Sequence, residues 1–324
     1  MEKRRKTKEH QWMRVMAERN GLDESGRRRL GALDIGHAGE CEFDGWIEDY
    51  GSERWRVYRD VWIDAGGPTQ VDTMIVSAAG IFIFDVKNYS GEYAYSGGNW
   101  SVNGRPLIKD IFVQLKRSME KVTFMLGAID PSVPAEGRIV FINEHLSFEA
   151  EGAVQDRVVM RHVLKKHILE MDGGHPRLRM PVDVLCREIE AFFIDCTYPP
   201  PRCDASLYLK MDKGVRCHRC GEFEHEVMRY HFMCLSCGYR EAKEKAVLRS
   251  ICEYGVIRND CKLRVADIHH FLGGTVGERY IRSILIKYFR VAARGRHAAY
   301  VNPGEVMEYL FAGMNFRYKD WNQE

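Results

Sequence analysis

The sequence has no hydrophobic run long enough to cross a membrane. Its most apolar stretch, residues 74–84, spans 11 residues and includes a serine and a glycine, whereas a transmembrane helix needs about 18 or more apolar residues. The basic amino end, residues 1–8, is followed by charged residues where a signal peptide would have its apolar core. We therefore expect no membrane contact and no secretion.

The chain also lacks a charge surplus, internal repeats and low-complexity segments. Its 48 Lys and Arg against 46 Asp and Glu give a net charge of +2, which does not indicate an acidic partner. The 45% hydrophobic and 11% aromatic residues exclude a disordered or fibrous protein. A length of 324 residues predicts two or three globular domains.

Disulfide-type cysteine spacing is absent as well. Of the 10 cysteines, four lie in two Cys-x2-Cys pairs and the others are scattered, several among apolar neighbours (Cys186, Cys196 and Cys252). This usage indicates one metal site together with reduced thiols, and hence a cytoplasmic location.

Hydrophobic periodicity predicts an α+β domain at residues 36–198. It contains helices at 36–50, 108–127 and 158–171, strands at 55–63, 70–77, 80–88 and 137–143, and a hairpin at 93–105. Residues 1–35 form a basic N-terminal arm or short helix, in which 3–8 is interpreted as solvated. Residues 199–213 are a proline-rich linker. A cysteine module at 214–240 precedes a domain at 241–324, with helices at 241–254, 265–272, 277–289 and 305–311 and a hairpin at 290–300.

The cysteine module has the spacing of a zinc ribbon. Cys217 and Cys220 form one pair, Cys234 and Cys237 the other, and a glycine follows each pair. Four thiolates at this spacing suit a tetrahedral, structural Zn²⁺ ion. The alternative of four buried free thiols conflicts with the polar residues of this segment.

A second pattern places charge inside an apolar sheet. Alternation along residues 80–87 puts Asp85 and Lys87 on one face of a strand. Asp72 lies in the preceding strand, and pairing of the two strands would bring the two aspartates together. Glu40 is expected at the first turn of the 36–50 helix, where it could approach the aspartates or, alternatively, only interact with the helix dipole. Two carboxylates and a lysine suit metal-dependent phosphodiester hydrolysis, in which Asp72 and Asp85 hold Mg²⁺ or Mn²⁺.

These residues carry a family resemblance. The sequence resembles the nuclease-related domain (NERD) family, a branch of the PD-(D/E)xK restriction-endonuclease-like superfamily. The resemblance rests on Gly39-Glu40, Thr69-Gln-Val-Asp72, the run from Gly80 to Gly91 that contains Asp85 and Lys87, Trp100 and Gln114. The resemblance covers about residues 36–145. Asp85 stands where the family more often has Glu, and Thr73 replaces a frequent His.

The resemblance implies an α/β/α core with a mixed sheet and a set of catalytic residues. Asp72, Asp85 and Lys87 would form the catalytic core, Glu40 would support the metal, and Gln114 would point at the site from the following helix.

The carboxyl-terminal segment is locally basic. Between residues 279 and 300 there are six basic and no acidic residues: Arg279, Arg282, Lys287, Arg290, Arg294 and Arg296. Three helices followed by a basic hairpin resemble a winged helix whose third helix and wing contact DNA phosphates. The alternative is a solvated basic face on a protein-binding domain.

Together these features predict a metal-dependent DNA nuclease with zinc-ribbon and winged-helix-like modules. RNA is not excluded as a substrate, and one motif set per chain is compatible with a homodimer or a nicking monomer. The alternative is a catalytically inactive nuclease fold that acts as a DNA-binding or regulatory module.

Overall fold

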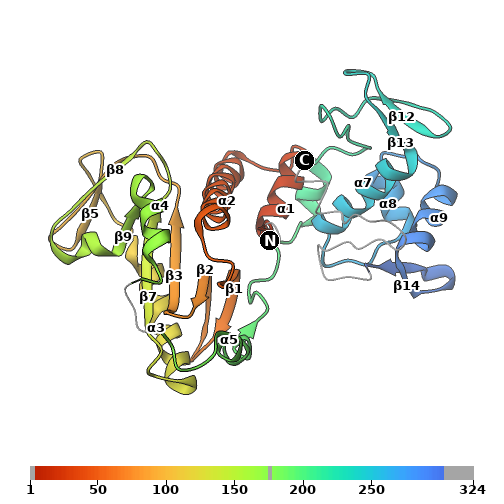
Figure 1. The fold of residues 1–324 in the computed structure, drawn as a ribbon. Coiled ribbons are helices and arrows are strands. Elements are labelled where there is room, and N and C mark those ends of the chain that lie inside the picture. Colours follow the sequence, from red (N-terminus) through yellow and green to blue (C-terminus); the bar gives the residue numbers. More distant parts are fainter. Residues whose placement is uncertain (1–3, 174–176, 303–324) are drawn as a thin grey trace. The chain divides into compact units, whose positions relative to one another are not determined.

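The computed structural model describes residues 4–173 and 177–302. Its contacts divide the chain into two compact units (Figure 1). The first contains the residues up to Arg5 together with Ala32–Tyr198, and the second contains Lys6–Gly31 and the residues from Pro199 onward. The helix expected at 305–311 lies outside the described residues. Within the described part of the chain, no helix is both long and apolar enough to span a bilayer.

A six-stranded mixed sheet forms the centre of the first unit. Its strand order is β10-β1-β2-β3-β7-β9; β1, β2 and β3 form an antiparallel meander, and β7 and β9 continue it in parallel. The strands are β1 (Arg56–Asp64), β2 (Pro68–Ser77), β3 (Gly80–Lys87), β7 (Ala135–Phe141), β9 (Val158–Met160) and β10 (Phe193–Ile194). The meander confirms the strand prediction, whereas residues 158–160, expected to be helical, form an edge strand.

Helices cover both faces of this sheet. On one face, α2 (Glu24–Tyr50) and α4 (Arg161–Glu170) pack against Phe82, Phe84 and Val86. On the other, α3 (Phe112–Ile129) and α5 (Val182–Glu190) pack against Met74, Ile81 and Ile83. Because successive side chains of β3 point to opposite faces of the sheet, its apolar residues contribute to both cores. The result is the expected α/β/α arrangement.

The helix that carries Glu40 is longer than its hydrophobic pattern predicts. It begins at Glu24 and not near Gly36, because its first turns are polar and give no periodic signal. Glu40 therefore lies far from the helix amino end, and the prediction that it sits in the first turn is wrong. The macrodipole, which acts within the first turn, does not account for this residue.

A second, four-stranded sheet stands beside the central one. Its order is β6-β5-β4-β8, with β4 (Gly91–Ser96), β5 (Asn99–Val102), β6 (Arg105–Leu107) and β8 (Leu146–Ala150), followed by the 3₁₀ turn η1 (Gly152–Arg157). The glycine-rich segment thus forms the expected hairpin. Trp100 is buried between the two sheets' aromatic residues, and its Nε1 donates to Asp110 at 3.0 Å.

The second unit contains the zinc-ribbon fold and a helical part. The segment expected as an arm or short helix is the helix α1 (Lys8–Ala17), in which Trp12, Val15 and Met16 are buried. The linker contains α6 (Ala205–Lys210), and the ribbon is a three-stranded sheet of β11 (His225–Val227), β12 (His231–Cys234) and β13 (Arg240–Ala242).

The residues after the ribbon have a winged-helix-like order. Helices α7 (Lys243–Ile257), α8 (Val265–Phe271) and α9 (Glu278–Tyr288) precede a hairpin of β14 (Arg290–Ala293), the 3₁₀ turn η2 (Gly295–His297) and β15 (Ala299–Val301). An isolated antiparallel bridge joins Leu263, before α8, to Tyr300 of β15. This arrangement agrees with the predicted fold class.

A buried ionic cluster joins the ribbon to α7. Arg249 is 2% exposed and contacts Glu241 of β13 at 2.8 Å and Glu253 at 2.9 Å. Glu253 also contacts Arg19 at 2.5 Å. Because every charge in the cluster has a buried partner, the cost of removing these groups from water is offset.

Candidate active site

Two aspartates meet where β2 and β3 lie side by side. The antiparallel register pairs Thr73 with Phe84 and Met74 with Ile83, so the next position brings Asp72 next to Asp85. Both carboxylates are buried, at 8% and 3% exposure. The structure therefore brings together the two aspartates that strand alternation predicted.

Lys87 and Gln114 complete this group. Lys87 Nζ lies 2.5 Å from Asp85 Oδ1 and donates to Gln114 Oε1 at 3.0 Å. The amide nitrogen of Gln114 donates to Asp72 Oδ1 at 3.0 Å. Gln114, near the start of α3, thus connects the lysine of one strand to the aspartate of the other.

The electrostatics of this group favour a bound cation. Burial, together with the charge of Asp85, raises the pKa of Asp72 to about 7. Burial lowers the pKa of Lys87, but Asp85 and Asp72 outweigh it and the net shift is upward, so the amine stays protonated. A protonated lysine acts as a hydrogen-bond donor and a positive charge and does not act as a general base.

The donor set fits a divalent metal ion. Asp85 Oδ2 is a buried carboxylate oxygen without a hydrogen-bond partner among the described residues, and Asp72 offers a second carboxylate beside it. Oxygen ligands of this kind suit Mg²⁺ or Mn²⁺, which retain several waters. The two aspartates form a pair only: within the described residues, the cysteine cluster is the one place where three or more metal-ligating side chains converge.

Glu40 lies in a neighbouring acidic cluster. Its carboxylate contacts Arg4 at 3.4 Å, and Arg4 also contacts Asp44 at 3.0 Å and Asp60 at 2.9 Å. Burial, with Asp60 nearby, raises the pKa of Glu40 to about 8. The structure therefore places Glu40 close to the site, but it brings Glu40 to Arg4 and not into contact with Lys87 or Gln114.

The sequence patterns did not identify Arg4 and Asp60 as residues near the site. Arg4 belongs to the run interpreted as solvated, yet its side chain is 0% exposed, so that interpretation is wrong for this residue. Asp60 lies in the middle of β1 and has a positive φ of 52°, which is uncommon for a residue other than glycine. An acidic residue in the middle of a strand was the available signal for Asp60; nothing in the sequence distinguished Arg4 from its basic neighbours.

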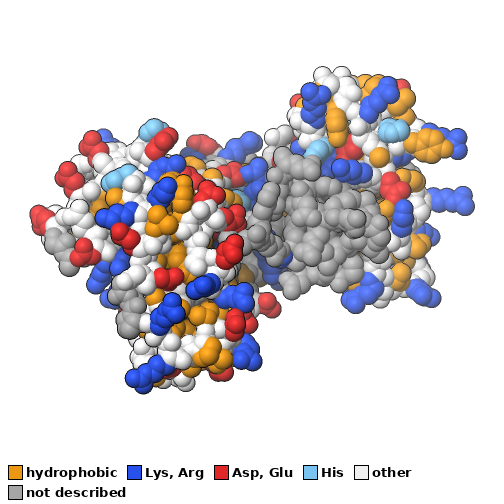
Figure 2. All heavy atoms as spheres, viewed as in Figure 1, with side chains coloured by type: hydrophobic (Ala, Val, Ile, Leu, Met, Phe, Trp, Pro, Cys, Tyr) orange, Lys and Arg blue, Asp and Glu red, His pale blue; other side chains and the backbone are white. Residues whose placement is uncertain are grey.

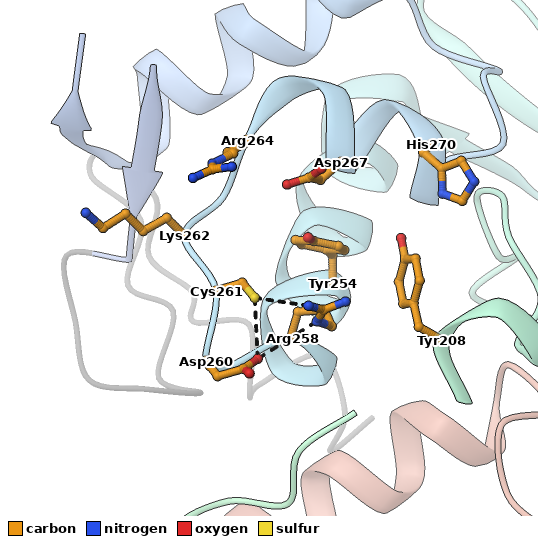
Figure 3. Close-up of a pocket in the computed structure, with 9 residues that line it drawn as sticks. All are labelled: Tyr208, Tyr254, Arg258, Asp260, Cys261, Lys262, Arg264, Asp267 and His270. Atoms are coloured by element: carbon orange, nitrogen blue, oxygen red, sulfur yellow. Dashed lines mark hydrogen bonds and ion pairs between the residues drawn. The ribbon is translucent and has the colours of Figure 1, made fainter. Parts of the chain in front are cut away.

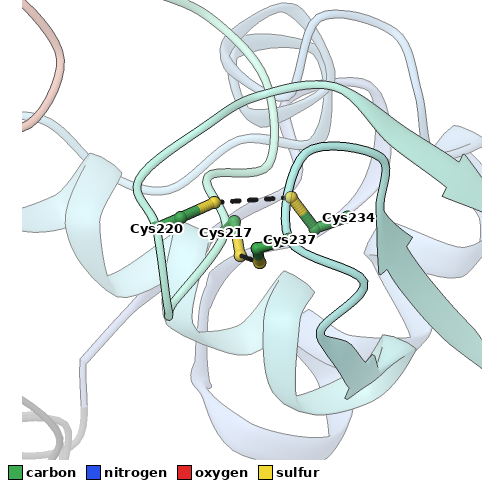
Figure 4. A group of neighbouring side chains, drawn as sticks. All are labelled: Cys217, Cys220, Cys234 and Cys237. Atoms are coloured by element: carbon green, nitrogen blue, oxygen red, sulfur yellow. Dashed lines mark hydrogen bonds between the residues drawn. The ribbon is translucent and has the colours of Figure 1, made fainter.

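The four cysteine sulfurs point toward one another from two loops (Figure 4). All lie within 4.8 Å of one another, with Cys217 to Cys237 at 3.7 Å and Cys220 to Cys234 at 3.5 Å. A tetrahedral Zn²⁺ with sulfur ligands would hold its sulfurs about 3.8 Å apart. Gly221 and Gly238 have positive φ values of 84° and 68°, so glycine permits the turn after each pair. The donor set fits a zinc ion.

The basic residues of the tail are exposed on the winged-helix-like part. Arg279 and Arg282 lie on α9, Arg290 on β14, and Arg294 and Arg296 around the turn of the hairpin. None of these five forms an ion pair within the described part of the chain, whereas Lys287 is held by Glu244 at 2.5 Å. In Figure 2, Lys and Arg side chains project around the visible margin of the second unit, while both signs of charge intermix on the first.

The second unit also has a pocket that the sequence did not predict (Figure 3). Its volume is about 540 Å³, and its lining combines aromatic and charged side chains. Arg258 lies 5.4 Å from the ring centre of Tyr208 and is held by Cys261 at 3.2 Å. The lining residues are Tyr208, Tyr254, Arg258, Asp260, Cys261, Lys262, Arg264, Asp267 and His270. None of them belongs to a site expected from the sequence.

Comparison with known proteins identifies one region. Residues 35–142 match the family described as nuclease-related domain (NERD). No curated protein and no solved structure gives a significant match to the chain. The matched region contains Glu40, Asp72, Asp85, Lys87 and Gln114, the residues through which the sequence resembled this family. Over residues 35–142, a third of the chain, the sequence is therefore similar to the nuclease-related domain family.

Proposed function

We propose that the protein is a metal-dependent nuclease that hydrolyses DNA phosphodiester bonds. The observation that carries the proposal is the joined set of Asp72, Asp85, Lys87 and Gln114 within the matched domain. In this proposal Asp72 and Asp85 hold Mg²⁺ or Mn²⁺. When bound, such an ion polarises a phosphate oxygen and lowers the pKa of a coordinated water.

The chain's own residues supply position and charge. Lys87, protonated and fixed between Asp85 and Gln114, donates hydrogen bonds toward the attacking water or the phosphate and neutralises charge that develops there. Gln114 is exposed on its outer side, so the site opens to solvent where α3 begins. Glu40 supports the acidic cluster behind the site.

In this proposal the zinc ribbon binds a metal ion and the winged-helix-like part binds DNA. The cysteine cluster holds one structural Zn²⁺ through Cys217, Cys220, Cys234 and Cys237. The exposed arginines Arg279, Arg282, Arg290, Arg294 and Arg296 contact DNA phosphates, and Lys287 contributes when it leaves Glu244. Such phosphate contacts position the protein without reading sequence.

A cleavage assay tests the function. Purified protein is incubated with supercoiled, linear and single-stranded DNA and with RNA, in metal-depleted buffer and after addition of Mg²⁺ or Mn²⁺. The expected result is cleavage of DNA only after the metal is added, and none by Asp72→Asn. DNA binding without cleavage under all conditions would favour the inactive DNA-binding module and contradict the nuclease.

A further inference from the structure

Arg4 is enclosed by the acidic cluster next to the candidate active site. Its Nε and Nη2 donate to the two carboxylate oxygens of Asp44 at 3.0 and 3.2 Å. Its Nη1 contacts Asp60 at 2.9 Å and Glu40 at 3.4 Å. Three carboxylates thus surround one guanidinium group that has no exposed surface. A planar fork of donors is required for this geometry, and lysine cannot reproduce it.

Arg4 also contacts the backbone that carries Asp72. The β1–β2 ladder pairs Arg59 with Thr73 and Val61 with Val71, and it is interrupted between them at Asp60 and Asp72. At this interruption Arg4 Nη1 donates to the main-chain oxygen of Asp72 at 3.1 Å, and Nη2 donates to Thr73 Oγ1 at 2.8 Å. Arg4 therefore fixes the peptide that follows Asp72 where the sheet does not.

Asp72 is thus held from two directions. Its carboxylate accepts from Gln114 on the side of Asp85 and Lys87, while its carbonyl accepts from Arg4 on the side of Glu40 and Asp60. A second basic residue near the cluster, Arg59, contacts Asp44 at 2.9 Å and Glu48 at 3.8 Å.

We propose that Arg4 is a positioning residue of the nuclease site, which fixes the Asp72 peptide and joins the Glu40 cluster to the metal-binding aspartates. The inference rests on the proposed function and extends it to a residue outside the matched domain. Partners that orient metal ligands commonly contribute about 10- to 100-fold in metal affinity or activity.

The test compares Arg4→Ala and Arg4→Lys with Arg5→Ala, which removes the same charge from the exposed neighbouring position. Any affinity tag is placed at the carboxyl end. Three quantities are measured: kcat and KM for DNA cleavage, Mn²⁺ binding by electron paramagnetic resonance, and the unfolding temperature. We expect kcat and Mn²⁺ affinity to fall about 10- to 100-fold in both Arg4 variants, with KM for DNA within twofold of wild type and Arg5→Ala unchanged.

Chemical rescue distinguishes positioning from general loss of structure. The Arg4→Ala variant leaves a buried space bounded by Asp44, Asp60 and Glu40, and millimolar guanidinium should enter it and restore kcat while leaving wild type unaffected. If Arg4→Ala keeps wild-type kcat and Mn²⁺ affinity, the inference is overturned. A rise in both quantities would also overturn it, because Arg4 would then compete with the metal.

The two proposals fail in different ways. If wild type binds Mn²⁺ through Asp72 but cleaves no nucleic acid, the proposed function fails, and weaker Mn²⁺ binding by Arg4→Ala still supports the inference. If wild type cleaves and the Arg4 variants match it, only the inference fails. If Asp72→Asn leaves Mn²⁺ binding unchanged, the aspartates are not the metal site and both proposals fail.

Discussion

Gln114 and Asp72 are joined by a hydrogen bond of 3.0 Å, although 42 residues separate them in the chain. The other end of the same amide accepts from Lys87. A glutamine amide can do both because it carries donors on nitrogen and an acceptor on oxygen. One side chain on α3 thus fixes the relative positions of a carboxylate and an amine that belong to different strands.

The first prediction concerns this group. Asp72→Asn should reduce cleavage at least about a hundredfold, because it removes a proposed metal ligand while keeping the shape and the position of the side chain. Lys87→Ala should have a similar effect through loss of the fixed positive charge. Cleavage of DNA at saturating Mg²⁺ is the measurement, with circular dichroism to verify folding.

The matched control for Asp72→Asn is Asp49→Asn, the same change at an exposed position of α2. It should cleave DNA at the wild-type rate. Cleavage by purified Asp72→Asn at a rate within a few-fold of this control would remove Asp72 from the active site.

A second prediction links the site to stability. The pKa of Asp72 is raised to about 7 in the fold, whereas an unfolded aspartate has a pKa of about 3.9. The unfolded chain therefore loses this proton first as the pH rises, and the fold loses stability between about pH 4 and pH 7. In metal-depleted buffer, Asp72→Asn should unfold at a higher temperature than wild type at pH 8, and the difference should shrink toward pH 4.

Thermal unfolding at several pH values checks this relation, and Asp49→Asn again serves as control. Added Mg²⁺ should raise the unfolding temperature of wild type at pH 8 and should have a smaller effect on Asp72→Asn, since a ligand stabilises the state that binds it. A constant difference between the two proteins from pH 4 to pH 8 would show that Asp72 is ionised normally in the fold.

The sequence predicted the parts of the site that depend on local repetition. Strand alternation placed Asp85 and Lys87 on one face, and the length of the meander brought Asp72 beside them. The sequence did not reveal Arg4, because its role depends on a contact 68 residues away with the Asp72 carbonyl. It also missed the early start of α2, since polar turns carry no hydrophobic period.

The cysteine spacing was sufficient for the ribbon but not for its surroundings. The two Cys-x2-Cys pairs and the glycines that follow them predicted the two turns that carry the cysteines, because short-range geometry determines these turns. The buried cluster of Arg249, Glu241 and Glu253 was not predicted, since each residue alone resembles an ordinary surface charge. Only the folded second unit brings Glu241 of β13 to Arg249 of α7.

The third prediction concerns zinc. Purified, reduced protein should contain about one Zn²⁺ per chain, and Cys237→Ser should lower this content. Chelation should unfold the ribbon, because a module of this size gains its stability from the metal. Elemental analysis measures the content, and Cys196→Ser, at an exposed cysteine outside the cluster, is the control. Equal zinc content in both variants would exclude the four-cysteine site.

The fourth prediction concerns the buried ionic cluster of the second unit. Arg249→Met should reduce the free energy of unfolding by about 3–5 kcal/mol, because it leaves Glu241 without its buried partner. Arg240→Met makes the same change one residue away from Glu241, at an exposed position, and should change stability by less than about 0.5 kcal/mol. Denaturant unfolding measures both. Similar stability of the two variants would show that the cluster contributes little.

The last prediction separates DNA binding from chemistry. If the hairpin after α9 contacts DNA, each arginine that neutralises a phosphate releases counterions. Changing Arg290, Arg294 and Arg296 to Ala should therefore weaken binding and reduce the slope of log affinity against log salt by up to about 2.7. Fluorescence anisotropy with labelled duplex DNA at several salt concentrations measures both quantities.

Cleavage then shows where the lost interaction acted. The triple variant leaves Asp72, Asp85, Lys87 and Gln114 intact, so its rate at saturating DNA and low salt should equal that of wild type, while its rate at limiting DNA falls. A control variant with Arg27, Arg54 and Lys166 changed to Ala removes the same charge from exposed positions elsewhere and should keep the wild-type salt slope. If the hairpin variant keeps it too, the basic tail serves a protein contact, and DNA capture belongs to the ribbon or to the nuclease-related domain.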